Sequence, residues 1–165
     1  MIFVTVGTHE QQFNRLIRQI DLLKGKGIIN EDVIIQTGFS TYEPKYCMWR
    51  KLIPYKEMQE RIKEARIVIT HGGPSSFIAP LQIGKIPVVV PRQKQYDEHV
   101  NDHQLSFCRE VRNRMGNIIL VEDIADLEKV ILDYSQYVKN IPSGQQSNNE
   151  TFNNKFERIV EELLK

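Results

Sequence analysis

Short apolar runs alternate with segments of helical period along most of this 165-residue chain, and this alternation constrains the fold more than any other feature. Strands that alternate with helices form parallel sheets whose two faces are covered by the helices. A chain of this length is typical of one domain. We therefore expect one Rossmann-like α/β domain, a parallel sheet with helices on both faces. The expected strands are residues 1–6, 32–37, 46–50, 65–69, 87–91 and 117–121.

The segments between these strands carry apolar residues at helical spacing. They predict helices at residues 13–24, 56–64, 75–83, 97–114 and 123–137, which complete a domain over residues 1–140. Residues 141–150 combine proline, glycine and glutamine and are predicted to be a polar linker. Residues 151–165 have the pattern of an amphipathic helix, which either packs back on the domain or docks on a partner.

Charge and composition exclude several classes of protein. The formal net charge is +1, so no overall field favours nucleic acid or an anionic membrane. No apolar run approaches the roughly 20 residues of a membrane-spanning helix. Cys47 and Cys108 are expected to pack as small apolar side chains in a reducing compartment. We expect a cytoplasmic protein without a nucleic-acid partner.

Glycine and polar residues follow four of the expected strands. Ligands of open parallel sheets bind at the carboxyl ends of the strands. Because these ends meet at one edge of the sheet, they predict a single ligand crevice. The residues are Gly7-Thr8-His9, Gln36-Thr37-Gly38, His71-Gly72-Gly73 and Arg92.

The turn after the strand at 65–69 is the most specific of these segments and reads His71-Gly72-Gly73-Pro74-Ser75-Ser76. Glycines allow a close backbone approach, and the free N–H groups at a helix start attract an anion. Ser75 and Ser76 are expected to cap the helix or to donate hydroxyl hydrogens to an oxyanion. A glycine turn with a serine cap is also complete without a ligand, so the residues alone leave both interpretations open.

The same turn resembles the nucleotide-sugar half of GT-B glycosyltransferases, together with segments before and after it. These segments are Phe3–Phe13, Gln36-Thr37-Gly38, Gly84, Pro87–Pro91 and Glu98-His99. The combination is similar to small soluble catalytic subunits of the family 28 C-terminal-domain type, which pair with a membrane-anchored partner. Bacterial capsule and exopolysaccharide subunits and the eukaryotic dolichol-linked N-acetylglucosaminyltransferase subunit belong to this group. The resemblance covers residues 1–135 and implies the C-terminal, donor-binding half of a GT-B enzyme.

The resemblance implies roles for particular residues. The diphosphate and sugar of a UDP-sugar would contact Gly7, Thr8, His71, Gly72, Gly73, Pro74, Ser75, Ser76, Arg92, Glu98 and His99. Uridine would contact Gln36, Thr37, Gly38, Ile53, Pro54 and Tyr55. Arg92 is alternatively a solvated surface arginine, and Glu98 and His99 are expected to begin a helix. The catalytic base is unknown; His9 is a candidate, and the partner is another source.

Two details qualify the resemblance. Many relatives carry a glutamate eight residues after the motif histidine, where it binds the ribose, and this chain has Ala79 there. His99 and His103 have the i,i+4 spacing of zinc ligands, but no further ligand set accompanies them, so we expect neither a metal nor another cofactor.

The predicted function is that of a donor-binding subunit of a two-chain inverting glycosyltransferase in polysaccharide biosynthesis. It would use UDP-galactose or UDP-N-acetylglucosamine and a lipid-linked glycan acceptor, at the inner membrane face, through a membrane-anchored partner. The alternative is a non-catalytic accessory subunit that activates or stabilises a partner glycosyltransferase. An unrelated nucleotide-binding α/β protein is a third possibility, disfavoured because the P-loop and Gly-x-Gly-x2-Gly patterns are missing from the sequence.

Overall fold

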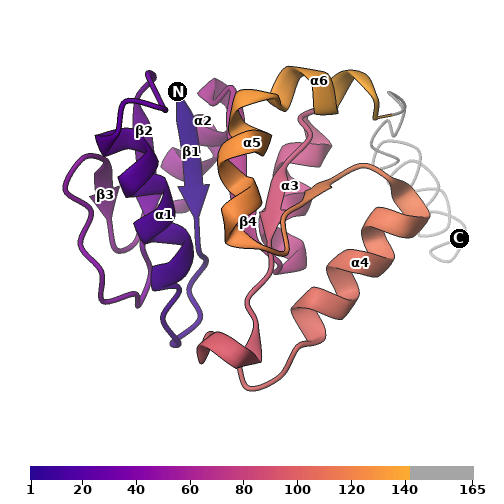
Figure 1. Ribbon diagram of the computed structural model, residues 1–165, viewed down its shortest axis with the longest axis horizontal. Helices are drawn as coiled ribbons and strands as arrows, with labels where there is room; N and C mark the ends of the chain where they lie inside the picture. The colour runs from indigo at the N-terminus through magenta and orange to yellow at the C-terminus, as the bar shows by residue number, and fades with distance from the viewer. Residues whose placement is uncertain (142–165) are drawn as a thin grey trace, which may run out of the picture.

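The computed structural model describes residues 1–141, which form a six-stranded sheet in the order β3-β2-β1-β4-β5-β6 (Figure 1). Every neighbouring pair of strands is parallel. The strands are Ile2–Thr5 (β1), Val33–Gln36 (β2), Met48–Arg50 (β3), Ile67–His71 (β4), Val88–Val90 (β5) and Ile119–Leu120 (β6). The chain order reverses between β1 and β4, and such a switch point opens a crevice at the carboxyl ends of the strands.

The strands bury both of their faces, as a parallel sheet between two helix layers requires. In β4, Ile67 and Ile69 join the larger apolar cluster on one face, and Val68 joins a second cluster on the other. Helices Asn14–Gly25 (α1), Leu127–Leu132 (α5) and Tyr134–Lys139 (α6) cover the first face. Helices Tyr55–Glu64 (α2), Pro74–Gln82 (α3) and His103–Met115 (α4) cover the other (Figure 1). The predicted Rossmann-like fold is confirmed.

Two of the predicted helices have different bounds in the structure. The helix expected from residue 97 begins at His103, because Asp97 has a left-handed backbone (φ 55°) that ends the short 3-10 segment Lys94–Tyr96 (η1) and cannot continue a helix. The helix expected at 123–137 is a 3-10 turn, Ile124–Asp126 (η2), followed by α5 and α6, which are separated at Asp133. The predicted helix at 151–165 and residues 142–150 of the predicted linker lie outside the described residues.

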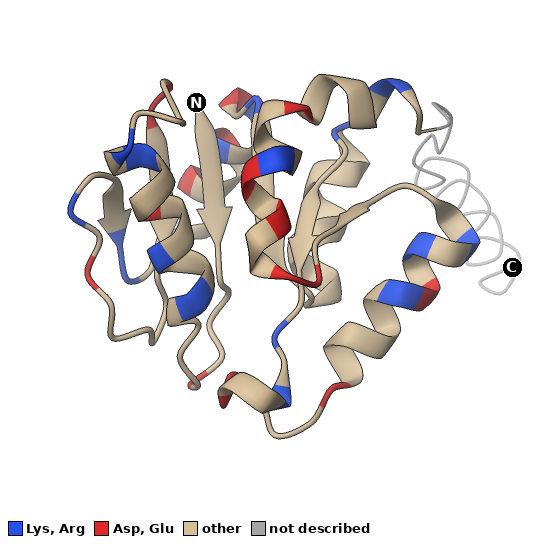
Figure 2. Ribbon diagram, viewed as in Figure 1, with Lys and Arg blue, Asp and Glu red and all other residues tan. Residues whose placement is uncertain are grey.

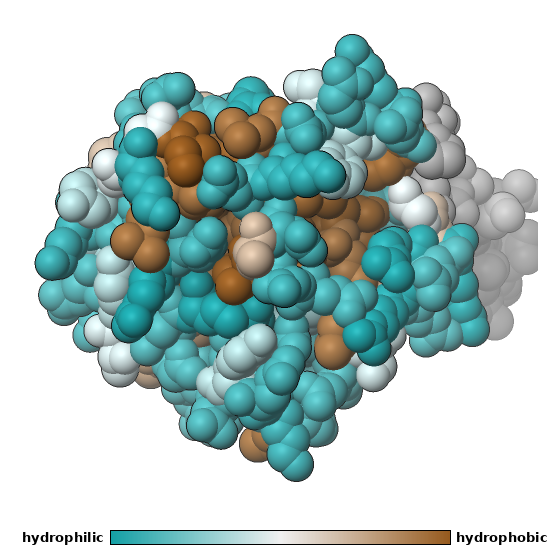
Figure 3. Space-filling model, in the orientation of Figure 1, coloured by the Kyte–Doolittle hydropathy of each residue, from teal (hydrophilic) through white to brown (hydrophobic). Residues whose placement is uncertain are grey.

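Both charge signs occur on the visible face of the molecule. Figure 2 shows lysine and arginine along α1 and α4, with aspartate and glutamate on neighbouring segments. The same face is mainly hydrophilic, with apolar patches between the charged side chains (Figure 3). Within residues 1–141, no helix combines the length and apolarity that crossing a membrane would require.

Asp21 is a fully buried acid on the sheet-facing side of α1, and the sequence patterns did not single it out. Its carboxylate accepts a hydrogen bond from the Tyr42 hydroxyl at 2.8 Å. It also accepts from the backbone N–H groups of Lys45, Tyr46 and Cys47 at 2.9, 2.8 and 3.1 Å. One carboxylate therefore fixes the loop between β2 and β3. It accepts hydrogen bonds from loop N–H groups that regular secondary structure would otherwise pair with backbone carbonyls.

These contacts predict an acid-sensitive contribution to stability. Burial is the largest influence on the pKa of Asp21 and raises it, but the four hydrogen bonds together outweigh burial and hold the pKa below its usual value. The stabilisation is therefore complete above the unfolded-state pKa and disappears as the pH falls through the lower, folded-state pKa. We expect Asp21→Asn to lower the free energy of unfolding by about 1–3 kcal/mol at pH 7, and by less at pH 3.

Urea unfolding at both pH values measures this difference. Glu60→Gln, which changes an exposed acid on α2, is the control and is expected to stay within about 0.5 kcal/mol of the wild type. A deficit of the Asp21 variant that is equal at pH 7 and pH 3 would contradict the assignment.

Candidate functional site

The carboxyl ends of β1 and β4 lie side by side at the switch point, with Thr5 paired to Thr70. Each strand continues into a glycine turn. After β1 the chain turns at Gly7, whose φ of +73° lies in the left-handed region that favours glycine. After β4 it turns at Gly72-Gly73, and β4 itself extends through His71, two residues beyond the predicted strand end. The two turns therefore lie close together at the switch point, where a crevice is expected in this kind of sheet.

The imidazole of His71 fills the space between these turns. A Cβ added to Gly7 would lie 2.5 Å from the ring atom Cε1, and one added to Gly73 would lie 2.4 Å from Nε2. The side chain is 8% exposed, so the ring has little room to move aside. Glycine is therefore required at both positions, and His71 sets the separation of the two turns.

His71 is a neutral group in this site. Burial, together with the nearby Arg92 guanidinium, lowers its pKa to about 4. The backbone of Thr5 acts in the opposite direction and raises the pKa of His71. No group stands in hydrogen-bond geometry to Nδ1 of His71 within the described residues, so this effect is weak. His71 therefore acts through its shape and its neutral ring, and it does not supply a positive charge at neutral pH.

Helix α3 begins at this turn without a side-chain cap. Gly73 is the N-cap and Pro74 the first helical residue, so the predicted capping by Ser75 or Ser76 is wrong. Proline suits the first helical position because its missing N–H would have no helical partner. Both serines lie in the first turn, Ser75 exposed and Ser76 half-buried. Their hydroxyls and the helix start form a set of donors suited to an oxyanion.

Arg92 lies beneath the crevice and is fully buried, so the alternative of a solvated surface arginine is wrong. Nη1 donates to the carbonyls of Gln11 and Gln12 at 2.9 Å and of Glu98 at 3.1 Å, and Nη2 donates to that of Val6 at 3.0 Å. Burial lowers its pKa to about 10, and it stays charged at neutral pH. Arg92 thus ties the end of β1, the β1–α1 loop and the segment after β5 together.

Glu98 is also fully buried and lies in the turn before α4, so the prediction that it begins the helix is wrong. Its Oε1 accepts from Nε of Arg15 at 2.8 Å, and its Oε2 accepts from Nη2 of Arg15 at 2.9 Å and from the Gln93 backbone at 3.0 Å. Both carboxylate oxygens are therefore occupied. The predicted sugar contact of Glu98 remains a prediction, and it would require this ion pair to open.

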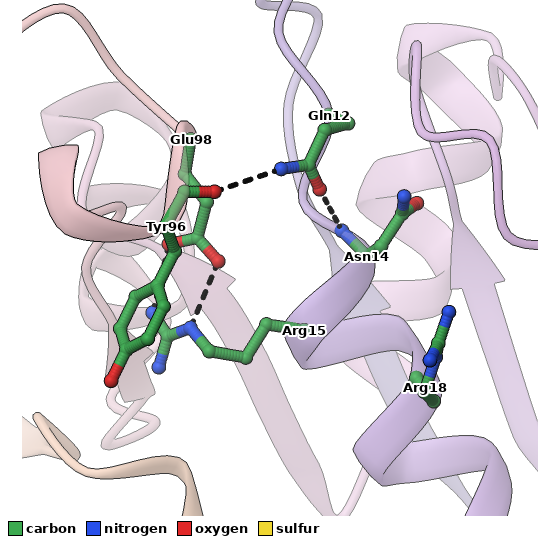
Figure 4. A pocket seen from close by; sticks show the side chains of 6 residues that line it. All are labelled: Gln12, Asn14, Arg15, Arg18, Tyr96 and Glu98. Carbon is green, nitrogen blue, oxygen red and sulfur yellow. Dashed lines mark hydrogen bonds and ion pairs between the residues drawn. The ribbon is translucent and has the colours of Figure 1, made fainter.

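Arg15 was not identified from the sequence, although it fixes the turn after β5. Its guanidinium carbon lies 4.5 Å from the centre of the Tyr96 ring and 5.5 Å from that of Phe13. Figure 4 shows it reaching from α1 to Glu98, at the edge of a hollow of about 410 Å³. The sequence does not indicate this role, because Arg15 lies next to the apolar face of α1, at a position where an exposed arginine is equally common.

The predicted uridine-binding residues brace the neighbouring strand ends. The Gln36 amide donates to the Thr5 hydroxyl at 3.2 Å and accepts from the Ile53 backbone at 3.0 Å. The N–H of Thr37 donates to the carbonyl of Arg50 at the end of β3, at 2.9 Å, and that of Gly38 to the carbonyl of Lys51, at 2.8 Å. These polar groups are engaged within the protein, so they position the segment around Ile53.

The segment around Ile53 leads into α2. Ile53 is buried, Pro54 is the N-cap of α2, and Tyr55 is 75% exposed at the helix start. Ala79, where many relatives carry a ribose-binding glutamate, packs against the apolar cluster that contains Ile53. The structure thus brings this segment and α3 together, and their roles in uridine and ribose binding remain predictions.

Two further sets of residues bear on chemistry. Cys47 and Cys108 are free and buried, and burial raises the pKa of each thiol to about 12, so neither is a nucleophile at neutral pH. Among the described residues, no group of three or more histidine, cysteine or acidic side chains is arranged to hold a metal ion.

The parallel sheet, the switch point and the glycine turns place the chain among Rossmann-like ligand-binding domains. A sequence model of the glycosyltransferase family 28 C-terminal domain matches residues 1–163, and the chain belongs to this family. It is therefore a GT-B glycosyltransferase domain of the kind that binds a nucleotide sugar.

The fold is also similar to a crystal structure of the glycosyltransferase SnogD from Streptomyces nogalater, with a TM-score of 0.49 and 18% sequence identity. The likeness covers 86% of this chain and 39% of that chain. This chain thus spans well under half the length of that protein. A search of curated proteins found no match.

Proposed function

We propose that this chain is the donor-binding subunit of a two-chain inverting glycosyltransferase that uses UDP-galactose or UDP-N-acetylglucosamine. The main support for the proposal is the pair of glycine turns around His71 together with the start of α3 beside the switch point. The first two residues of α3 are exposed there. In this arrangement the diphosphate lies at the helix start, against the serine hydroxyls. Uridine lies over the segment from Ile53 to Tyr55.

The reaction needs charge stabilisation more than a nucleophile in this chain. The acceptor hydroxyl oxygen attacks the anomeric carbon while the bond from that carbon to the phosphate oxygen breaks. The electron pair leaves with UDP, and the hydroxyl proton goes to a base, with the configuration inverted. Donors at the start of α3 stabilise the charge that develops on the leaving diphosphate. The base belongs to the partner in this proposal, with His9 as the candidate within this chain.

Exposed apolar side chains near the crevice support a partner chain. Phe39 follows β2, Leu52 follows β3 and Val100 lies after β5, and these side chains are 56%, 55% and 68% exposed. Single exposed apolar side chains are common on soluble proteins, so the support depends on one partner covering all three together. We propose that the acceptor-binding subunit covers this rim, carries the membrane anchor and delivers a lipid-linked glycan at the cytoplasmic membrane face.

Isothermal titration with UDP tests the donor site. Ser75→Glu places a negative charge at the second residue of α3 and is expected to weaken UDP binding at least about tenfold by repulsion at the helix start. Ser135→Glu is the matched control, because Ser135 is the exposed second residue of α6. A chain that binds no UDP, either alone or with its partner, would refute the proposal.

A non-catalytic accessory subunit remains the second candidate, favoured by Ala79 and by the ion pair that occupies Glu98. Co-expression with the partner separates the two. Transfer activity that survives Ser75→Glu would favour the accessory role, and its loss would favour donor binding.

A further inference from the structure

All four histidines of the chain lie at the carboxyl edge of the sheet. His71 ends β4, His9 follows β1, His99 lies in the turn after β5, and His103 is the first residue of α4. The ring centres of His9 and His99 are 4.9 Å apart, and those of His99 and His103 are 4.5 Å apart. The three imidazoles therefore lie in ring contact beside the glycine turns, tilted at 39° in the first pair and edge-on at 74° in the second, and we call His9, His99 and His103 the histidine stack.

Backbone contacts determine where the neutral rings of His9 and His99 carry their hydrogen. Nδ1 of His9 accepts from the N–H of Gln11 at 3.2 Å, and Nδ1 of His99 accepts from that of Asn101 at 3.4 Å. An accepting Nδ1 has no hydrogen, so the hydrogen of each neutral ring is on Nε2. Both rings thus hold an Nε2–H donor that no hydrogen bond within residues 1–141 uses.

His103 has the opposite arrangement. Its Nδ1 contacts the side-chain oxygen of Asn101, which can only accept a hydrogen bond, so Nδ1 carries the hydrogen. Its Nε2 is then the basic nitrogen, and the side chain is exposed. His103 can take up a proton without losing a backbone contact, whereas His9 and His99 would each have to give one up.

The surroundings of the histidine stack are basic. Burial lowers the pKa of His99, and His103, His9 and Arg92 lower it further. Arg92 is thus close to the stack, and so is His71, because His9 also lowers the pKa of His71. On the adjoining turn, Glu98 pairs with Arg15 and Asp102 accepts from the Lys94 backbone. Among the described residues no acid forms an ion pair or hydrogen bond with a ring of the stack, and a bound oxyanion would supply such a partner.

We propose that His9, His99 and His103 form a second anion-binding subsite, which takes the sugar-side phosphate of a nucleotide-diphosphate sugar while His103 gains a proton on Nε2. The proposal rests on the proposed donor function. The two Nε2–H groups donate to phosphate oxygens, and protonated His103 supplies a cation. The start of α3 then holds the other phosphate, so the two subsites share the diphosphate.

Proton uptake makes donor affinity depend on pH in one direction. A bound phosphate favours the charged form of His103. Affinity therefore rises as the pH falls through the bound-state pKa, and it stops rising below the free-state pKa. One linked proton gives at most about a tenfold change in affinity for each pH unit.

Calorimetric titration with a UDP-sugar at pH 6 and pH 8 tests this, in buffers of different ionisation enthalpy that reveal the number of protons taken up. A UDP-sugar is the right probe because both of its phosphates are diesters, whereas a terminal phosphate titrates near pH 6 by itself. We expect binding about tenfold tighter at pH 6 than at pH 8, with net proton uptake between these values. Binding without proton uptake would overturn this inference and leave the donor function intact, whereas no binding at either pH would overturn the donor function.

Variants of exposed His103 assign the proton. His103→Gln is expected to abolish proton uptake and to remove the tighter binding at pH 6. His103→Lys places a fixed charge there and is expected to bind tightly at both pH values. Arg109→Gln removes an exposed charge from the same helix and should keep the wild-type pH dependence. Wild-type proton uptake in folded His103→Gln would overturn the assignment.

Discussion

Replacing Arg92 with methionine is expected to lower the free energy of unfolding by about 3–5 kcal/mol, the range found when one member of a buried charged network is removed. Methionine fills much of the volume but donates no hydrogen bond. The four carbonyls that Arg92 contacts would then lose their partner. Because these carbonyls shape the floor of the crevice, UDP binding should be lost with them.

Urea unfolding measures the effect, with Arg114→Met as the control. The Arg114 side chain is 76% exposed and pairs with Glu110 one turn away, so its replacement should change stability by less than about 0.5 kcal/mol. Arg92→Lys should fall between the two, because an ammonium group has fewer donors than the planar guanidinium fork. A loss under about 1 kcal/mol in Arg92→Met would mean that water replaces the guanidinium.

The substitution Gly7→Ala is expected to cost about 2–5 kcal/mol and to abolish UDP binding. Two effects contribute to this range. An alanine at φ +73° costs about 1–2 kcal/mol in the left-handed region. A Cβ placed 2.5 Å from the His71 ring adds about 1–3 kcal/mol of overpacking, because that ring is itself enclosed.

Two other glycines separate these effects. Gly84 has a similar φ of +75° with nothing within 4 Å of an added Cβ, so Gly84→Ala should show only the backbone cost. Gly73 has an ordinary φ of −77° and an added Cβ 2.4 Å from His71, so Gly73→Ala should show only the clash. Thermal and urea unfolding of the three variants compare them. Equal losses for Gly7→Ala and Gly84→Ala would show that His71 moves aside.

Local patterns in the sequence were sufficient to predict the sheet and the turns at its carboxyl edge. Apolar runs ended by glycines predict strands and turns from a few adjacent residues, which is why the turn at Gly72-Gly73 lay where we expected it. The start of α4 was misplaced, because the apolar and polar spacing after residue 97 is compatible with a helix. The left-handed Asp97 was the missed signal, since aspartate adopts that conformation more readily than most residues do.

The polar network of the site depends on contacts between distant parts of the chain. Glu98 is occupied by Arg15, which is 83 residues away in the sequence. Gln36 reaches Thr5 and Ile53 across two strand ends. A residue type and its spacing indicate that a polar group is near a crevice, but they do not indicate whether another chain segment already binds it. The roles of Arg92 and Glu98 could therefore be derived only from the fold.

The two edge strands of the sheet are short, since β3 has three residues and β6 has two. Such short edges present few unpaired backbone groups, and natural proteins use them to prevent strand addition. In the two-chain enzyme proposed above, the second chain would therefore have to recognise the side chains of the surrounding loops. Partner choice would then change through a few loop substitutions while the sheet stays the same, so related subunits of this fold would coexist in one cell without exchanging partners.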